Sequence, residues 1–331
     1  MNNSNNFRRI FKRLTLIAVF WTFCLIVLGA YVRLSDAGLG CPDWPGCYGH
    51  IGVPDSPDEL ARAQQLHPDS PVESAKAWKE MIHRYVAGGL GFLILAIVFL
   101  AITKQRYIGQ SPVLATSLIG VLLLQAALGM WTVTLLLKPA IVTAHLLGGL
   151  TTLGLLYWLA LRQMSFPSGG RDAGNLRTAS LVGLILVLIQ IALGGWVSTN
   201  YAALACTDFP TCQGSFWPAM EFGDAFHIFR ELGMKPNGAN LTMENVTAIH
   251  YLHRLMAGCV LAYGVWLAFR LVSTGFFRVL GYLLLGALAL QIAMGVGNVV
   301  LQLPLLLAVA HNAGAAFLLI VMLTINFRVR V

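Results

Sequence analysis

The sequence has 331 residues, of which 57% are hydrophobic and only 11% are charged. A water-soluble globular domain carries about 25% charged residues, and the mean hydropathy of +0.72 is far more apolar than such a domain. The composition therefore excludes an ordinary soluble protein. We expect an all-α membrane protein that crosses the bilayer several times.

Apolar windows give the number of crossings. A spanning helix needs about 20 apolar residues, and windows of this kind lie at about residues 14–33, 80–102, 112–136, 139–161, 178–198, 246–269, 277–300 and 304–327. The first window follows a basic segment, but no small-residue cleavage site ends it. We therefore interpret it as an uncleaved signal anchor and predict eight transmembrane helices.

The predicted membrane topology explains the net charge of +8. If the N-terminus lies in the cytoplasm, Asp172 is the only acid inside, and the basic residues inside are Arg8, Arg9, Lys12, Arg13, Lys104, Arg106, Arg162, Arg171, Arg177, Arg270, Arg278, Arg328 and Arg330. This is the positive-inside pattern of a membrane protein surrounded by lipid, so no nucleic-acid partner is needed to explain the charge. Both termini are predicted in the cytoplasm, with long outside loops at about 34–78 and 199–245.

The chain contains an internal repeat of four helices. At an offset of 165, Leu-Gly-Ala-Tyr-Val at 28–32 aligns with Leu-Gly-Gly-Trp-Val at 193–197, and a Cys-x-Asp-aromatic-Pro-x-Cys pattern occurs at 41–47 and 206–212. Because four is even, both copies have the same orientation, which predicts a pseudo-two-fold axis along the membrane normal. We expect two four-helix bundles, formed by residues 1–161 and 178–331 and joined by a cytoplasmic linker at 162–177.

Four histidines carry the main functional signal. His83, His145, His253 and His311 occupy repeat-related positions in the spans, each four to eight residues from the outer end of its window and so at a depth of roughly 6–12 Å. A single histidine in a membrane helix is often a packing hydrogen bonder. Two matched pairs at one level instead suit the axial coordination of two haem irons, because two imidazoles can hold a flat macrocycle between them.

Zinc is the alternative metal to haem iron, and close helix packing is the alternative role for the glycines near the histidines. Zinc commonly takes three or four converging ligands, whereas each half offers two deep histidines. Nearby glycines would let a large ring approach the backbone, and the alternative for each is close helix packing. These glycines are Gly88, Gly89, Gly148, Gly149, Gly258 and Gly314.

Charged residues beside the histidines differ between the halves. Arg84 and Arg254 directly follow two of the histidines and could pair with haem propionates, or could anchor the helix at the interface. Glu80 lies three residues before His83, on the same helix face, where the second half has His250. The carboxylate could be a solvated helix cap or could exchange protons during an oxidation. This difference predicts a reactive first half and a redox or structural second half.

The cysteine spacing points to an oxidising compartment. Cys41 and Cys47, like Cys206 and Cys212, lie in outside loops and are separated by five residues. We expect two disulfides, with a structural role favoured over a redox role. Closing so small a loop contributes about 2 kcal/mol in the chain-entropy model.

Taken together, these motifs resemble the haem A synthase family, in the bacterial type that carries a cysteine pair. The resemblance covers about residues 14–327 and rests on the ordered set of Glu80-x-x-His83-Arg84, His145, His253-Arg254, His311 and the first cysteine pair. It implies that the C8 methyl group of haem O is oxidised to the formyl group of haem A by successive hydroxylations, for use by haem–copper terminal oxidases. The second cysteine pair is not part of every member's pattern.

The family likeness also implies cofactors, site roles and location. His253 and His311 would ligate a resident haem b, while His83 and His145 would flank the substrate haem O with Glu80 as the catalytic carboxylate. Haem O would be delivered by haem O synthase, and the absence of a transit-type N-terminus favours a bacterial cytoplasmic (inner) membrane. The electron donor, the source of the added oxygen and the formation of a homo-oligomer are left open by the sequence.

Two rival functions follow from parts of the pattern. A dihaem b-type cytochrome that oxidises quinol would also use two histidine pairs, although carriers that pass electrons across the membrane need haems near both faces. A transporter is suggested by the repeat alone, but no broken helix with charges at mid-membrane supports it. Haem O or haem A extracted together with haem b would distinguish the synthase from both.

The predicted topology can be tested with a membrane-impermeant thiol reagent. After mild reduction of intact spheroplasts, the reagent should label Cys41, Cys47, Cys206 and Cys212, because both pairs are expected outside. Labelling should be read by mass spectrometry of the modified peptides. If modification needs the membrane to be opened first, the orientation is the reverse of the one predicted.

Overall fold

The computed structural model describes residues 2–331, apart from the side chains of residues 2–4, 170–173 and 175. Arg171 and Asp172 of the predicted linker therefore have side chains outside the described part. Within the described residues the chain is almost entirely helical, and eight helices are long and apolar enough to cross a membrane. The predicted fold class and number of spans are confirmed.

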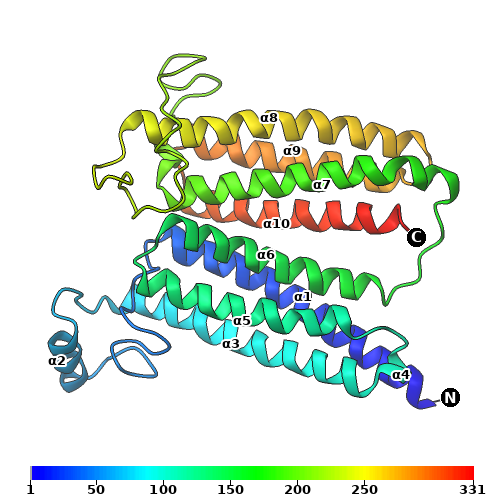
Figure 1. Cartoon of the computed structure of the whole chain (residues 1–331), viewed down its shortest axis with the longest axis horizontal. Helices are drawn as coiled ribbons and strands as arrows, with labels where there is room; N and C mark the ends of the chain where they lie inside the picture. Colours follow the sequence, from blue (N-terminus) through cyan, green and yellow to red (C-terminus); the bar gives the residue numbers. More distant parts are fainter. Residues whose placement is uncertain (1) are drawn as a thin grey trace. The chain divides into compact units, whose positions relative to one another are not determined.

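The chain divides into two compact units, Met1–Leu156 and Tyr157–Val331. The first contains α1 (Asn2–Leu34), α3 (Ser74–Thr103), α5 (Val113–Thr134) and most of α6 (Pro139–Leu161), and the second contains α7 (Gly170–Thr199), α8 (Met243–Ser273), α9 (Arg278–Val300) and α10 (Leu305–Arg328) (Figure 1). The last residues of α6 belong to the second unit because Tyr157 Oη lies 2.7 Å from Thr324 Oγ1 and Trp158 stacks edge-on against Phe327. The pseudo-two-fold axis stays a prediction.

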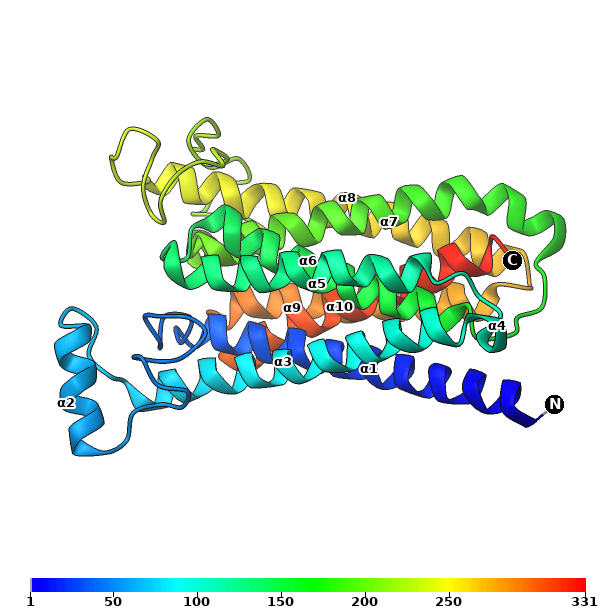
Figure 2. The same ribbon diagram turned by 60° about the horizontal axis from the view of Figure 1, so that its bottom comes forward.

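Each unit is a bundle of antiparallel helices, as Figures 1 and 2 both show. In the second unit, α7 packs on α8, α8 on α9, α9 on α10 and α10 on α7, which closes a ring of four helices. In the first unit, α3 lies between α1 and α5. Two helices begin with a capping box: Ser56 and Glu59 form one on the short loop helix α2 (Pro57–Leu66), and Thr242 and Asn245 form one on α8.

Each unit has one long connection, between its first two spanning helices, and its other connections are short. The α5–α6 and α9–α10 turns have the same backbone, with two consecutive residues at positive φ in each, Leu136 and Leu137 in one and Gln302 and Leu303 in the other. The long segments 35–73 and 200–242 lie at one end of their units, which we call the loop end. The short helix α4 (Gln105–Ile108) lies at the opposite end.

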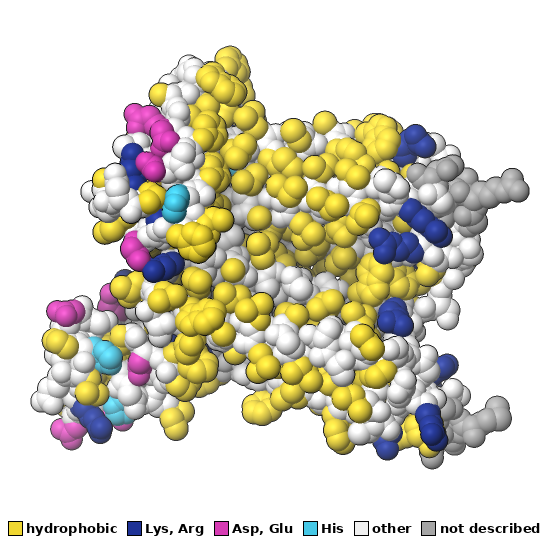
Figure 3. Space-filling model, viewed as in Figure 1, with side chains coloured by type: hydrophobic (Ala, Val, Ile, Leu, Met, Phe, Trp, Pro, Cys, Tyr) yellow, Lys and Arg dark blue, Asp and Glu magenta, His cyan; other side chains and the backbone are white. Residues whose placement is uncertain are grey.

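The two ends of each unit carry opposite charge. Figure 3 shows Asp and Glu side chains at the loop end, together with some Lys and Arg, whereas the other end shows Lys and Arg without visible acids, and hydrophobic side chains lie between the two ends. At the basic end several cations stack on aromatic rings: Arg270 on Trp266, Arg328 on Phe166 and Arg330 on Trp158, with 4.7–5.8 Å from the guanidinium carbon to the ring centroid. This distribution is typical of a polytopic membrane protein.

Candidate functional site

Each of the four predicted histidines lies against a glycine of the neighbouring helix. The pairs are His83 with Gly29, His145 with Gly129, His253 with Gly194, and His311 with Gly295. A methyl group added to the glycine would lie 3.0–3.3 Å from the nearest ring atom, which is tighter than a relaxed carbon contact of about 3.5–4.0 Å. Glycine is therefore the residue that lets each imidazole lie directly on the backbone of the next helix.

The histidines form one pair in each unit. His83 of α3 and His145 of α6 are close enough to interact electrostatically, and so are His253 of α8 and His311 of α10. All four rings are half-buried in the described structure. The structure therefore brings together the two pairs that the sequence predicts.

Three of the histidines are also tied to a glutamine on the neighbouring helix. In each case the glutamine Nε2 donates to the main-chain oxygen of the histidine, at 3.0–3.1 Å. The glutamine–histidine pairs are Gln125 with His145, Gln190 with His253, and Gln291 with His311. Gln190 Nε2 also lies 3.1 Å from His253 Nδ1. These contacts fix the height of the histidine helix relative to its neighbour.

Two of the glycines singled out in the sequence make room for these glutamines. A Cβ at Gly148 would lie 2.2 Å from Gln125 Oε1, and a Cβ at Gly314 would lie 2.2 Å from Gln291 Oε1. Gly88 and Gly258 are exposed, and nothing lies within 4 Å of a Cβ built on either. Helix packing thus explains Gly148 and Gly314 and does not explain Gly88 or Gly258.

The donor set fits haem iron. Imidazole is a common axial ligand of haem, and the Nδ1 atoms of His145 and His311 are buried with no hydrogen-bond partner among the described residues. In the part of the chain whose side chains are described, no three His, Cys, Asp or Glu residues come together, so the observed arrangement offers two imidazoles a unit. His83 and His145 would hold one macrocycle, and His253 and His311 the other.

Both cysteine pairs form disulfides, which close the first turn of each long loop. Inside each ring one aspartate accepts hydrogen bonds from the two residues that follow the second cysteine: Asp43 from the amides of Tyr48 and Gly49, and Asp208 from those of Gln213 and Gly214, at 2.6–3.0 Å. Hydrogen bonds from the Thr211 hydroxyl and from these amides lower the pKa of Asp208 to about 2. The carboxylate is therefore ionised at all physiological pH values and keeps the loop folded.

In the first unit, Arg84 joins this loop to Glu80. Arg84 Nη1 donates to the carbonyl oxygens of Asp43 (2.9 Å) and Gly46, and Arg84 Nη2 is ion-paired with Glu80. The other Glu80 oxygen accepts a hydrogen bond from the Cys41 amide at 3.0 Å. Glu80 is only 5% exposed, so it is a buried carboxylate under the disulfide loop rather than a solvated helix cap.

In the second unit, Arg254 holds the disulfide loop in the same way, and the neutral imidazole of His250 takes the place of the Glu80 carboxylate. Arg254 Nη1 donates to the carbonyl oxygens of Asp208 and Thr211 at 2.9 Å, and Nη2 donates to that of Cys206. Arg254 Nε donates to His250 Nε2, so His250 carries its proton on Nδ1 and donates it to the Ala202 oxygen at 3.0 Å. Both arginines hold a loop, and their predicted contact with haem propionates stays a prediction.

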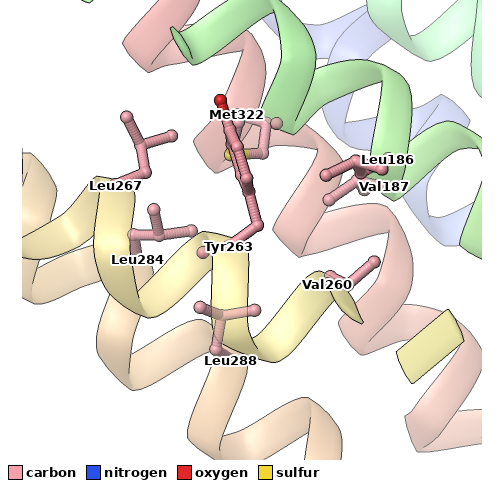
Figure 4. Close-up of a pocket in the computed structure, with 10 residues that line it drawn as sticks. Leu186, Val187, Val260, Tyr263, Leu267, Leu284, Leu288 and Met322 are labelled. Carbon is pink, nitrogen blue, oxygen red and sulfur yellow. The ribbon is translucent and has the colours of Figure 1, made fainter. Parts of the chain in front are cut away.

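A small cavity inside the second unit is not large enough for a cofactor. It has a volume of about 10 Å³ and is lined by apolar side chains of α7, α8, α9 and α10, among them Tyr263, Leu267 and Met322 (Figure 4). That volume is about that of one water-sized probe, and Tyr263 Oη is already bonded to the Ala179 oxygen. The cavity is therefore a packing void.

The sequence reasoning missed Gln190 and the glycines beneath the histidines. A signal for both was present, because Gln-x-x-x-Gly occurs at 125–129, 190–194 and 291–295, in three of the four helices that face a histidine. The spacing places both residues on one helix face, one turn apart.

Comparison with known proteins places these motifs in a family. The family model described as COX15-CtaA, cytochrome oxidase assembly protein, matches residues 12–323. A heme A synthase of Shewanella oneidensis is 46% identical over 94% of this chain and 94% of its own length. Relatives with the same name from Nitrosospira multiformis and a Chelativorans species are 30% and 28% identical and cover 93% and 94% of this chain, respectively, and 90% and 89% of their own.

The contact between histidine and glycine can be tested in the second unit. Gly194→Ala should displace the His253 ring by a few tenths of an ångström, since the added carbon would lie 3.0 Å from it, and should lower the haem content of the purified protein. Gly286→Ala on α9 is the control, because nothing lies within 4 Å of its added carbon. Absorbance of extracted haem per protein measures both. Equal haem content in the two variants would show that the close contact does not matter.

Proposed function

Because this chain belongs to the COX15-CtaA family of cytochrome oxidase assembly proteins, we propose that it acts as a haem A synthase, an oxidoreductase that converts the C8 methyl group of haem O into the formyl group of haem A. The identity of 46% with a named heme A synthase over 94% of both chains carries this proposal. The paired histidines and the buried carboxylate supply the chemical parts that such a reaction needs. The three relatives named above are all heme A synthases, and none of them is an electron-transfer cytochrome.

The two units have separate tasks in this proposal. The first unit takes haem O between His83 and His145, and the second holds a resident haem b between His253 and His311. What supports the division is the residue three positions before the first histidine of each pair. It is the buried carboxylate of Glu80 in the first unit and the neutral imidazole of His250 in the second. Among the residues whose side chains are described, only Glu80 is a buried acid, and it lies in the first unit.

Glu80 handles protons in the proposed reaction. Oxidation of a methyl to a formyl group removes four electrons, replaces two C–H bonds by one C=O bond and needs an oxygen atom from O2 or water, so an external oxidant must take up the electrons and protons must leave the site. When bound, haem supplies the oxidising chemistry. Glu80 lies one turn from His83 under a loop that excludes bulk water, and its contact with Arg84 connects it to the loop end. A carboxylate in this place can take up a proton and pass it toward the solvent.

Location and partners complete the proposal. The separation of basic and acidic ends supports a chain in the bacterial inner membrane with both termini in the cytoplasm and both disulfides in the periplasm. Haem O, which is poorly soluble in water, would reach the first unit from haem O synthase through the membrane. The electron donor would act on the second unit, through the resident haem b.

The division of tasks predicts different losses of haem. His253→Ala or His311→Ala should remove the low-spin haem b spectrum from the purified protein, because each deletes one axial ligand. His83→Ala or His145→Ala should keep most of that spectrum and abolish conversion of haem O. Optical spectra and haem chromatography measure both effects. Equal loss of haem b from the two sets of variants would rule out the division.

Glu80→Gln tests the carboxylate. A general acid or base contributes roughly 10²- to 10⁴-fold in rate, so cells that depend on the variant should accumulate haem O or partly oxidised haem while the protein keeps haem b. Glutamine also gives up one acceptor, because both Glu80 oxygens receive hydrogen bonds in the structure. Some loosening of the loop is therefore expected as well.

Asp43→Asn separates these two effects. It weakens the loop by removing an acceptor of the Tyr48 and Gly49 amides but leaves Glu80 in place. The haem A content of cells expressing Asp43→Asn should fall far less than that of cells expressing Glu80→Gln. If the two variants lower haem A equally, Glu80 acts by holding the loop and has no role in proton transfer.

A further inference from the structure

The four helix pairs that carry a histidine are not equivalent. In three of them the helix facing the histidine has a glutamine one turn before the glycine, and that glutamine donates to the main-chain oxygen of the histidine. In α1 the same position is Leu25, four residues before Gly29. Leucine has no donor, so the contact that ties the other three histidines cannot form at His83.

The first pair is tied at a different level. Trp21 Nε1 of α1 donates to the Val86 oxygen of α3 at 3.2 Å, one turn of α1 below Leu25 and about one turn of α3 below His83. The Trp21 ring also covers Gly89, where a Cβ would lie 2.9 Å from it. The deeper part of α3 is therefore held against α1. Among the described residues, no side chain forms a hydrogen bond with the ring or the main chain of His83.

The missing contact matters because few others could replace it in a membrane. An interhelical hydrogen bond in an apolar medium has no competition from water, and the histidine oxygen that receives it already accepts a bond within its own helix. The glutamine therefore restricts how far the histidine segment can rotate or slide. At His145, His253 and His311 this restriction is present, and at His83 it is absent.

We propose that Gln125, Gln190 and Gln291 are positioning residues that hold three of the four histidines in place, and that His83, beside Leu25, is the one that moves to admit haem O and release haem A. The first part concerns the hold on any bound haem. The second part rests on the proposed function. A resident haem b would then have two fixed ligands, and the substrate one fixed ligand and one movable ligand.

The hold on the resident haem is tested by haem transfer. Gln190→Met and Gln291→Met keep an apolar chain of similar length but remove the donor, and each should speed the transfer of haem b to added apomyoglobin about 3- to 10-fold. Ile189→Met and Leu290→Met are matched controls on the exposed side of the same helices. The g values of the low-spin ferric haem should shift as well, because they depend on the orientation of the two imidazole planes.

A second variant keeps the glutamine and moves it. A Cβ at Gly314 would collide with Gln291 Oε1, so Gly314→Ala should reproduce the faster transfer and the spectral shift of Gln291→Met. This guards against a variant that simply folds poorly. Transfer rates and g values that match the wild type in Gln190→Met, Gln291→Met and Gly314→Ala would overturn the positioning role.

The mobility of His83 is tested by adding a hydrogen-bond donor at position 25 of α1, where the other three helix pairs have a glutamine. Leu25→Gln should tie α1 to the His83 oxygen and slow the release of haem A from the purified protein about 3- to 10-fold, without changing haem b transfer. Leu25→Met is the control, because it adds no donor. Release of haem A at the wild-type rate from Leu25→Gln would overturn the role of His83.

Failure of these experiments can be distinguished from failure of the proposed function. The transfer of haem b needs no turnover, so it can support the positioning role even if the protein does not oxidise haem O. A protein that oxidises haem O but shows no change in haem transfer would keep the function and lose this inference.

Discussion

The contact between an imidazole and a bare glycine backbone is the constraint on which the rest of this structure depends. A histidine inside an apolar bundle needs space for its ring and a partner for its polar atoms, and the lipid supplies neither. Glycine on the neighbouring helix supplies the space at all four positions. Contact between the ring and that backbone fixes the distance between the two helices. The second histidine of each unit lies on another helix of the same bundle, against a glycine of its own neighbour.

The loop ends of the two units share one set of contacts and differ in one residue beneath them. An aspartate folds the disulfide loop, and the arginine after the first histidine of each pair holds the loop carbonyls against the helix. The residue one turn before that arginine then determines the character of the space below. A carboxylate there carries a charge and can accept a proton, whereas the imidazole of His250 has both nitrogens engaged. In the proposed function, this single difference in a duplicated frame separates the unit that carries out the chemistry from the unit that holds the resident haem.

The spans and the repeat could be read from the sequence because they depend on composition and periodicity. The predicted windows match α5, α6, α9 and α10 to within two residues, but α3 and α8 begin earlier, at Ser74 and Met243, since their first turns are polar and lie in the loop region. The contacts of Arg84 and Glu80 could not be predicted, because they depend on how the loop folds back over the helix. Gln190 could have been found, since its spacing to Gly194 repeats in two other helices.

The stacked arginines at the basic end affect how the protein sits among its lipids. A guanidinium over an aromatic ring still has N–H groups that can bind a phosphate. Arg270, Arg328 and Arg330 each lie over an aromatic ring at the basic end, where the surface potential of anionic headgroups favours cationic side chains. A neutral detergent micelle offers these groups no phosphate, so extraction removes the anionic surface that the basic end faces in a bilayer.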